Sequence, residues 1–331
     1  MDNARILVTG GAGFIGSELV RQLAATGNVV TVVDNLTNGK LHNIEELFGN
    51  NVRFYQADIR NRDMMKTLMQ GQDKVFHLAC LGVRHSIHSP LENHEVNATA
   101  TLYMLETAQE ANVKRFLYCS SSEVYGTATT VPMNESHPTF PMTVYGGSKL
   151  AGEAYARAYF QTYGLPVTVV RPFNSYGPRS HHEGDSGEVI PKFILRTMTG
   201  RPMLVFGDGT QTRDFTYVSD TASGIIRAGL SQNTIGETIN LGSCREISIS
   251  ELAATVKQVT GKSEAEIRYV DPRPGDVLRL FADSGKAQKL FGFTPKISLR
   301  DGLAKLLDWY TTEGLSFEDL LAGEKEINWK K

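Results

Sequence analysis

A short apolar strand that runs straight into a glycine-rich turn constrains this chain more than any other stretch. Its sequence is ILVTGGAGFIG, from Ile6 to Gly16, and a helical pattern follows it. Gly10 suits a tight turn, Gly13 leaves room for a pyrophosphate to approach the backbone, and Gly16 allows close packing of the helix. Because a helix N-terminus favours negative charge, the turn predicts an anion site, although a plain strand-to-helix turn can carry the same glycines.

A second apolar strand, Val29 to Asp34, ends in an acid eighteen residues after Gly16. An acid at this spacing accepts hydrogen bonds from the adenosine ribose hydroxyls of a dinucleotide. The Asp34 carboxylate would repel a 2′-phosphate, which favours NAD over NADP. Asp58 either reaches the adenine side or caps the helix before Asn61. The full set of predicted cofactor contacts is Gly10, Gly13, Phe14, Ile15, Gly16, Asp34, Asn35, Asp58, Ile59, Leu78, Ala79, Asn97, Tyr145 and Lys149.

Composition indicates a globular protein with a large core. The chain has 331 residues, of which 41% are hydrophobic and 21% charged. A net charge of −2 gives no basic field for nucleic acid or an acidic membrane, so a small polar metabolite is the expected partner. No apolar run has membrane-spanning length, and residues 1–5 lead directly into the first strand, so we expect a cytoplasmic protein. Cys80, Cys119 and Cys244 are expected to be reduced, buried thiols.

The first half of the chain alternates short apolar strands with helical patterns. This alternation predicts an α/β fold, a Rossmann-type doubly wound parallel sheet whose ligands lie beyond the carboxyl ends of the strands. We assign residues 1–176 to this NAD-binding domain and 177–331 mainly to a smaller C-terminal substrate-binding lobe, with some segments returning to the sheet. The expected strands are 5–8, 29–34, 52–56, 74–77, 115–120 and 167–171.

The pattern changes after residue 179. A loop at 180–187 precedes a predicted helix at 189–199 and a strand at 203–206, and Asp283 is a predicted helix cap. Residues 324–331 are expected to form a polar tail. Further helices are predicted at 218–230, 250–260 and 301–313.

Two polar motifs follow the fifth strand: SSSEVYG from Ser120 to Gly126, and YGGSK from Tyr145 to Lys149. A Tyr and a Lys four residues apart share one helix face, so an ammonium and a nicotinamide cation could both lower the pKa of the phenol. Tyr145 is therefore the predicted base, with Ser121 sharing the substrate proton. An ordinary amphipathic helix would explain the Tyr–Lys spacing if it stood alone. It would not explain why the same chain also has a glycine turn and a serine-rich strand end.

With these motifs, the chain resembles the extended short-chain dehydrogenase/reductase family, specifically its NAD-dependent nucleotide-sugar epimerases, dehydratases and decarboxylases. The resemblance spans nearly the whole chain. It includes the segments 9–16, 77–79, Asn97, Tyr145 with Lys149, RPFNSYGPR at 171–179, RDF at 213–215 and RPGD at 273–276.

The resemblance implies a nucleoside-diphosphate sugar as substrate. Asn174, Arg213 and Arg273 are then expected to hold the diphosphate, and residues 189–193, including Val189, Lys192 and Phe193, to cover the base. Arginine forks suit bidentate phosphate contacts. Family members first remove hydride from C4 of the sugar, which gives a 4-keto sugar. Epimerases return hydride to the other face, dehydratases eliminate water across C5 and C6, and decarboxylases lose the C6 carboxylate.

Glu123, with Ser121 and Ser122, bears on which of these reactions follows. Epimerases resembling this chain often carry a small residue at that position, whereas dehydratases and decarboxylases often carry the acid, which can take the C5 proton. Glucose-type dehydratases carry Asp where Ser122 stands, which weakens that subtype. We therefore favour a 4,6-dehydratase or uronate decarboxylase over a 4-epimerase. The alternative for Glu123 is a structural acid hydrogen-bonded under the turn at Gly126.

Several polar residues remain open to two interpretations. Arg84, beside Ser86 in the predicted substrate loop, either recognises a C6 carboxylate or is a solvated surface arginine. His181 and His182 hint at a metal, which the family mechanism does not need, so no metal is expected. His77 fits a buried core histidine. A non-catalytic NAD-binding scaffold on the same fold is disfavoured because Ser121, Tyr145 and Lys149 are all present, and the resemblance implies a homodimer.

Overall fold

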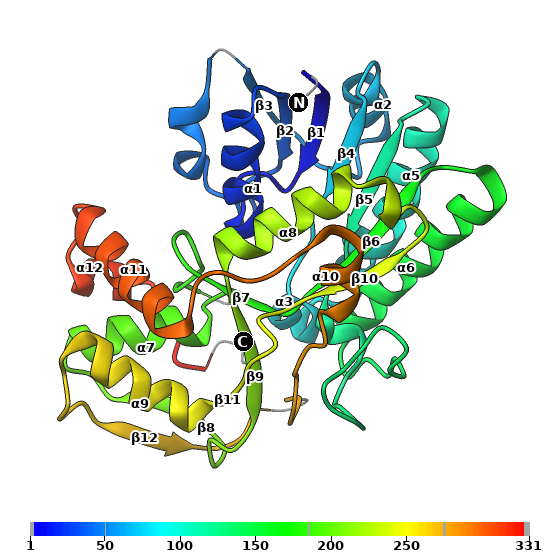
Figure 1. Cartoon of the computed structure of the whole chain (residues 1–331). Helices are drawn as coiled ribbons and strands as arrows, with labels where there is room; N and C mark the ends of the chain where they lie inside the picture. The colour runs from blue at the N-terminus through cyan, green and yellow to red at the C-terminus, as the bar shows by residue number, and fades with distance from the viewer. Residues whose placement is uncertain (1–2, 50, 185, 274–275, 328–331) are drawn as a thin grey trace.

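A parallel sheet forms the centre of the computed structural model, which describes residues 3–49, 51–184, 186–273 and 276–327 (Figure 1). Its strands are β1 (Arg5–Thr9), β2 (Val29–Asp34), β3 (Val52–Gln56), β4 (Lys74–His77), β5 (Arg115–Cys119), β6 (Val167–Pro172) and β10 (Thr238–Leu241). Within the described residues these seven strands run parallel in the order β10-β6-β5-β4-β1-β2-β3. The order reverses between β1 and β4, which is the position where doubly wound sheets bind ligands.

Helices connect the strands and cover both faces of this sheet. The long ones are α1 (Phe14–Ala25), α2 (Arg62–Met69), α5 (Ala100–Glu110), α6 (Val144–Tyr163) and α8 (Val218–Leu230). The shorter ones are α3 (Val83–His88), α4 (Pro90–His94), the π-helical turn η3 (Glu95–Thr99), α10 (Gly285–Phe291) and the 3-10 turns η1 (Leu41–Asn43), η2 (Glu45–Leu47), η4 (Ser122–Val124) and η5 (Gln232–Thr234). The architecture confirms the predicted Rossmann-type fold.

A second group of elements lies at the lower left of Figure 1, away from the central sheet. Its helices are α7 (Val189–Met198), α9 (Ile249–Thr260), α11 (Leu299–Thr312) and α12 (Phe317–Leu321). Its strands are β7 (Asn174–Tyr176), β8 (Met203–Phe206), β9 (Thr212–Tyr217), β11 (Glu246–Ser248) and β12 (Ile267–Val270). They form one sheet in the order β11-β9-β7 and another of β12 with β8. A separate apolar core, centred on α7, α9 and α11, holds this lobe together.

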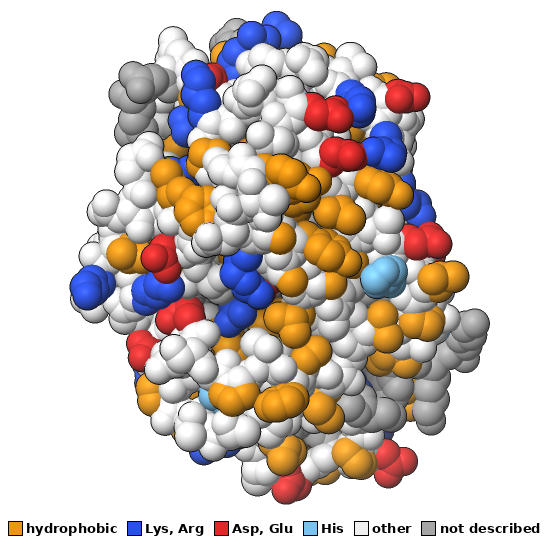
Figure 2. Space-filling model, turned by 90° about the vertical axis from the view of Figure 1, so that its right-hand side faces the viewer, with side chains coloured by type: hydrophobic (Ala, Val, Ile, Leu, Met, Phe, Trp, Pro, Cys, Tyr) orange, Lys and Arg blue, Asp and Glu red, His pale blue; other side chains and the backbone are white. Residues whose placement is uncertain are grey.

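The surface carries large hydrophobic side chains near α4 and before α6. Leu91, Phe140 and Met142 are 70%, 68% and 55% exposed. Figure 2 shows hydrophobic side chains gathered across the middle of one face, with acidic and basic side chains interspersed around them. In the described part of the chain, no helix combines the length and apolarity that crossing a membrane requires.

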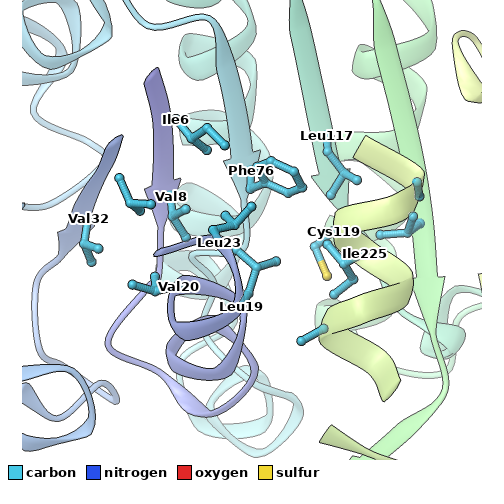
Figure 3. Packing of buried hydrophobic residues seen from close by; sticks show 14 of the residues in the cluster. Ile6, Val8, Leu19, Val20, Leu23, Val32, Phe76, Leu117, Cys119 and Ile225 are labelled. Atoms are coloured by element: carbon cyan, nitrogen blue, oxygen red, sulfur yellow. The ribbon is translucent and has the colours of Figure 1, made fainter. Parts of the chain in front are cut away.

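The alternation of side chains along β1 explains the two layers of helices. Ile6 and Val8 point to the face covered by α1 and α8, whereas Leu7 points to the face covered by α2, α5 and α6. Figure 3 shows the first face, where Leu19 of α1 and Ile225 of α8 pack with the sheet residues. Burial on both faces favours mostly apolar strands such as β1 and β2, whereas the edge strand β3, VRFYQ, is partly exposed.

Most predicted elements agree with the structure to within two residues at each end. Elements beyond residue 177 join the first domain, because β10 pairs with β6 and α8 packs against β5 and β6. The Asp283 carboxylate accepts the N–H of Gly285 at 2.8 Å, so it does cap α10, although the N-cap position belongs to Ser284.

Two expectations were wrong in part. Cys244 is exposed, although Cys119 is buried as expected and Cys80 is partly buried. The segment predicted as a polar tail is not solvated at Glu324, whose side chain is only 3% exposed because it pairs with Arg196. Residues 328–331 of that segment lie outside the described residues.

Candidate active site

The glycine turn borders a cavity of about 540 Å³ at the carboxyl ends of the strands. Gly10 has a φ of 71°, and a Cβ there would lie 2.7 Å from the Ala79 nitrogen. A Cβ on Gly16 would lie 2.0 Å from the carbonyl oxygen of Gly10, so Gly16 permits packing of the helix on the turn itself. Helix α1 has Gly13 as its N-cap and no side-chain cap. The positive end of α1 therefore faces the cavity across bare backbone.

Asp34 lies at the cavity wall where β2 ends. One carboxylate oxygen accepts the N–H of Ala12 at 3.0 Å and the other the N–H of Leu36 at 2.9 Å. Burial raises the pKa of Asp34, and these two hydrogen bonds oppose that rise. The carboxylate thus ties the glycine turn to the end of β2.

Asp58 also lines the cavity, and its oxygens accept hydrogen bonds from Arg60 and from the Asn35 amide, the latter at 3.0 Å. The Arg60 guanidinium lowers the pKa of Asp58 to about 2. The N-cap of α2 is Asn61, whose side chain accepts the N–H of Met64. The interpretation of Asp58 as the helix cap is therefore wrong.

Five other predicted cofactor residues line the same cavity: Phe14, Ile15, Ile59, Leu78 and Ala79. Asn97 is 1% exposed on the π-helical turn η3 and lies behind the wall. Its amide oxygen accepts the N–H of Leu81 at 2.8 Å, and its amide nitrogen donates to the carbonyl of Leu81 at 2.9 Å. Asn97 therefore holds the loop after β4 rather than lining the cavity.

Tyr145, Lys149 and Ser121 meet on the cavity floor. Ser121 lies close enough to Tyr145 to affect the pKa of its phenol, and the Lys149 ammonium lies 5.9 Å from the centre of the Tyr145 ring. Lys149 Nζ also donates to the carbonyl of Cys119 at 2.9 Å, which fixes the ammonium at the end of β5. Burial raises the pKa of Tyr145 well above its usual value, and the neighbouring Ser121 side chain opposes that rise.

A buried ion pair supports this floor from behind. Glu153 of α6 is fully buried and accepts from Arg171 of β6 at 2.8 and 2.6 Å. The Ser120 hydroxyl donates to the same carboxylate at 2.6 Å, and Arg171 donates to the Tyr125 hydroxyl at 2.8 Å. Because Ser120 and Tyr125 flank the segment with Ser121, these bonds hold that segment against α6.

Ser122 and Glu123 line the cavity beside this group. The N–H of Glu123 donates to the Ser121 hydroxyl at 3.2 Å. Burial raises the pKa of the Glu123 carboxyl, while the positive charges of Arg213 and Arg273 oppose the rise. The Glu123 side chain thus faces the cavity and its arginines, which contradicts the alternative of an acid bonded under the Gly126 turn.

Arg213 and Arg273 are joined by an acid that we did not predict. Both guanidinium groups donate to the same oxygen of Asp276, at 2.6 Å for Arg213. Arg213 also donates to the carbonyls of Val277 and Thr212, at 2.7 and 2.8 Å. Asn174 lines the same wall, and its amide oxygen is buried without a hydrogen-bond partner. Pro274 and Gly275 of the RPGD motif lie outside the described residues.

Arg84 points into the cavity and donates to the carbonyl of Ser186 at 3.4 Å. Burial and the nearby charge of Arg273 lower the pKa of Arg84 to about 10. The interpretation of Arg84 as a solvated surface arginine is therefore wrong. Ser86 is 3% exposed, donates to the carbonyl of Val83 at 2.6 Å and does not line the cavity.

Helix α7 carries the residues expected to cover the base. Val189 lines the large cavity, and all three of Val189, Lys192 and Phe193 line a neighbouring cavity of about 70 Å³. Glu188, which directly precedes this helix, also lines the large cavity and was missed. Burial raises the pKa of Glu188 to about 7 against the opposing charges of His181 and Arg84. The sequence feature that could have pointed to Glu188 is its position directly before a predicted helix.

His77 and His182 make side-chain contacts within the protein. His77 is 1% exposed, and its ring nitrogens contact the hydroxyls of Thr9 and Thr101 at 2.7 and 3.0 Å. Burial lowers its pKa to about 3, which confirms a core histidine. His182 faces Glu183 at 3.2 Å. Among the described residues, no group of three or more His, Cys, Asp or Glu side chains could hold a metal. Asp185, in the same predicted loop, lies outside that part of the chain.

Comparison with known proteins identifies the family. The profile of the family described as GDP-mannose 4,6 dehydratase matches residues 7–306. The chain belongs to this family of nucleotide-sugar enzymes. The match to this profile confirms the resemblance inferred from the sequence motifs.

Curated relatives carry three different reaction names. The chain is 35% identical over 318 residues to UDP-glucuronic acid decarboxylase 1 of Xenopus tropicalis, covering 94% of this chain and 73% of the relative. It is 34% identical to a UDP-glucose 4-epimerase of Mycolicibacterium smegmatis over 92% of this chain and 98% of the relative. It is also 34% identical to a dTDP-glucose 4,6-dehydratase of Streptomyces niveus, over 96% of this chain and 95% of the relative.

Solved structures agree in fold. An epimerase from Methanothermobacter thermautotrophicus superposes with a TM-score of 0.91 at 34% identity, covering 98% of this chain and 96% of that one. A UDP-glucuronic acid 4-epimerase from Bacillus cereus, solved with UDP-glucuronic acid and NAD, has a TM-score of 0.87 at 32% identity over 93% and 99%. Identity to the epimerases and to the other enzymes is so similar that it does not select one reaction.

Proposed function

We propose that this chain oxidises C4 of a nucleoside-diphosphate sugar, with NAD as its cofactor. The observation that carries the proposal is the cluster of Tyr145, Ser121 and Lys149 on the floor of a cavity that the N-terminus of α1 also borders. NAD fits the opposite wall, because the bare turn at Gly13 suits a pyrophosphate and Asp34 suits ribose hydroxyls. When bound, NAD supplies a hydride acceptor and a positive ring charge.

In this proposal Tyr145 takes the proton of the C4 hydroxyl and Ser121 orients that hydroxyl by a shared hydrogen bond. Burial raises the pKa of Tyr145, so positive charge is needed to favour the phenolate. Lys149 provides part of that charge, held in place by its bond to the carbonyl of Cys119. The buried Glu153–Arg171 pair keeps the two halves of this arrangement in register.

The diphosphate would lie against Arg213, Arg273 and Asn174. The two guanidinium groups converge on one carboxylate oxygen of Asp276, so they present their remaining donors from neighbouring positions. Arginine forks match phosphate oxygens bidentately. A diphosphate held in this way fixes one end of the substrate while the sugar reaches Tyr145.

For the step that follows oxidation, we propose elimination of water or loss of a carboxylate. Glu123 is a carboxyl group that lines the cavity beside Ser121, where it can exchange a proton with C5 of a 4-keto sugar. Arg84 also lines the cavity and could bind a C6 carboxylate, which would favour a uronic acid substrate.

A 4-epimerase is the second candidate, and one observation favours it. Burial raises the pKa of Glu123, and a protonated carboxyl cannot act as a base. If the acid stays neutral in the substrate complex, it cannot remove the C5 proton that dehydration requires, whereas hydride return to the other face of the ketone needs no such base.

The deciding experiment is incubation with UDP, GDP, dTDP and CDP sugars, read by mass spectrometry and NMR. A product lighter by water or carbon dioxide supports the proposal, and an isomer of unchanged mass supports the epimerase. No turnover of any sugar by a protein that binds NAD would favour a scaffold that does not catalyse.

We further propose that two copies of the chain associate through the face that includes Leu91, Phe140 and Met142. These large side chains are mostly exposed, with Leu91 on α4 and the other two just before α6, and the resemblance implies a homodimer through the helices that carry Asn97 and Tyr145. Sedimentation of the wild type and of Leu91→Glu tests this, since a monomeric wild type would contradict it.

A further inference from the structure

The C-terminal segment 323–326 is folded against the loop and the helix that line the cavities. The N–H of Gly184 donates to the carbonyl of Gly323 at 2.8 Å, and an isolated bridge joins Gly184 to Glu324. The same loop carries His181 and Glu188, which line the large cavity. The segment that the sequence predicts to be a polar tail therefore pairs with a wall of the candidate active site.

Arg196 on α7 is the anchor of this segment. Its side chain is 3% exposed, and its Nε donates to both oxygens of Glu324 at 2.8 and 3.0 Å. Its Nη2 donates to Glu326 at 2.8 Å, and its Nη1 to the carbonyl of Pro202 at 3.0 Å. A buried guanidinium with this many charge-assisted bonds holds its partners in one geometry.

The second cavity lies between α7 and this segment. Phe193 and Lys192 line it from α7, whereas Glu324 and Glu326 line it from the C-terminal side. Leu204 and Phe206 add apolar surface from β8 and its exit. A slot whose walls combine apolar and charged side chains suits a flat ring with hydrogen-bonding groups at its edge, which is the chemistry of a nucleobase.

Two arginines connect this slot to the large cavity. Arg84 and Arg273 line both. Lys192 Nζ donates to the carbonyl of Lys325 at 2.5 Å, so the C-terminal segment also fixes the position of that ammonium. Burial lowers the pKa of Lys192 to about 8, with the charge of Glu324 opposing.

We infer that residues 323–326 form one wall of the nucleoside subsite, and that Arg196 and Glu324 are positioning residues that hold α7 and Lys192 in the shape that receives the base. This inference rests on the proposed function, because it assigns the slot to the nucleoside of a nucleoside-diphosphate sugar. The diphosphate, bound by Arg213 and Arg273, and NAD, bound across the glycine turn, do not depend on the segment.

The test compares ligands that include or lack a nucleoside. Glu324→Gln keeps the size of the side chain and removes its charge, and Glu318→Gln on α12 is the matched control, since Glu318 is exposed. Binding of UDP, GDP, dTDP, CDP, inorganic pyrophosphate and NAD is measured by calorimetry. We expect Glu324→Gln to weaken the preferred nucleoside diphosphate at least tenfold and to raise KM with kcat nearly unchanged. Pyrophosphate and NAD should bind as in the wild type.

If Glu324→Gln fails to fold, Glu326→Gln serves in its place, because that side chain is 67% exposed and still bonds Arg196. It should weaken the nucleoside diphosphate severalfold with the same selectivity. If the variant bound the nucleoside diphosphate as tightly as the wild type, or lost affinity equally for pyrophosphate and NAD, the inference about residues 323–326 would be overturned. The proposed function would not be affected by that result. A wild type that binds no nucleoside diphosphate would instead overturn the proposed function.

Discussion

Ser121, in the segment after β5, and Tyr145, in the first turn of α6, line the same cavity, and the Ser121 side chain opposes the effect of burial on the pKa of the Tyr145 phenol. These residues lie far enough apart in the chain that only the folded sheet brings them together. Two hydroxyl groups therefore line one site, where one substrate hydroxyl can contact both. This arrangement is the geometric basis for assigning proton transfer to this pair.

Tyr145→Phe removes the proposed base without changing the shape of the ring. We expect turnover to fall by roughly 10²- to 10⁴-fold, as for the loss of a general base, while the free energy of unfolding changes little. Tyr163→Phe is the control, because Tyr163 lies at the exposed end of the same helix. Near-normal turnover by Tyr145→Phe would remove this residue from the mechanism.

Arg213→Ala and Arg273→Ala should each weaken nucleoside-diphosphate binding by roughly 1.5–3 kcal/mol, the range for hydrogen bonds to charged groups. NAD affinity should stay unchanged, and Arg268→Ala, whose side chain is 56% exposed, should bind every ligand normally. Calorimetry with free nucleoside diphosphates and with sugar nucleotides measures the effect. If only the sugar-bearing ligand lost affinity, these arginines would not hold the diphosphate.

Asp34 should make the protein bind NAD at least tenfold more tightly than NADP. Its carboxylate is held at the cavity wall by the N–H groups of Ala12 and Leu36, so a 2′-phosphate would meet a fixed negative charge. Asp34→Asn should reduce the ratio of NAD affinity to NADP affinity, because it removes the charge that repels the 2′-phosphate. Fluorescence titration with both cofactors tests this, and equal affinities in the wild type would contradict it.

Glu188 should make stability depend on pH. Burial raises its pKa from 4.5 to about 7, against opposing charges on His181 and Arg84 and with a further contribution from Glu183. The neutral form is therefore favoured in the folded protein, and the stabilisation is present below pH 4.5 and lost as the pH rises through about 7.

Glu188→Gln stays neutral, so it should match the wild type at acidic pH and be the more stable of the two above neutral pH. Urea unfolding at a series of pH values measures this difference. Parallel stability profiles for the two proteins would show that Glu188 ionises freely in the folded state.

The central sheet could be predicted because its buried strands are mostly apolar and helical patterns alternate with them. The glycine turn, Asp34 and the Tyr145–Lys149 spacing are local features, so their positions at one sheet edge followed from the topology alone. Arg84 remained ambiguous in the sequence, because the side of a short helix that faces a cavity depends on its neighbours.

Contacts between distant segments could not be read in the same way. Asp276 joins Arg213 to Arg273 only because the loop after β12 lies over β9. Glu324 is buried because Arg196 receives it on α7, whereas its own surroundings in the sequence are polar. Asn97 has a side-chain amide of the kind that binds ligands. In the structure this amide forms hydrogen bonds with the backbone of Leu81 instead.

The measurement that tests the account most directly is turnover in heavy water with an accepted nucleotide sugar, by the wild type and by Glu123→Gln. Glu123 lines the cavity beside Ser121, so it is the carboxyl placed to exchange the C5 proton. The wild type should release water or carbon dioxide and incorporate deuterium at C5 whenever C5 is reprotonated. Glu123→Gln should still reduce the cofactor but stall at the 4-keto sugar. Clean inversion at C4, with no change of mass and no deuterium at C5, would contradict the account.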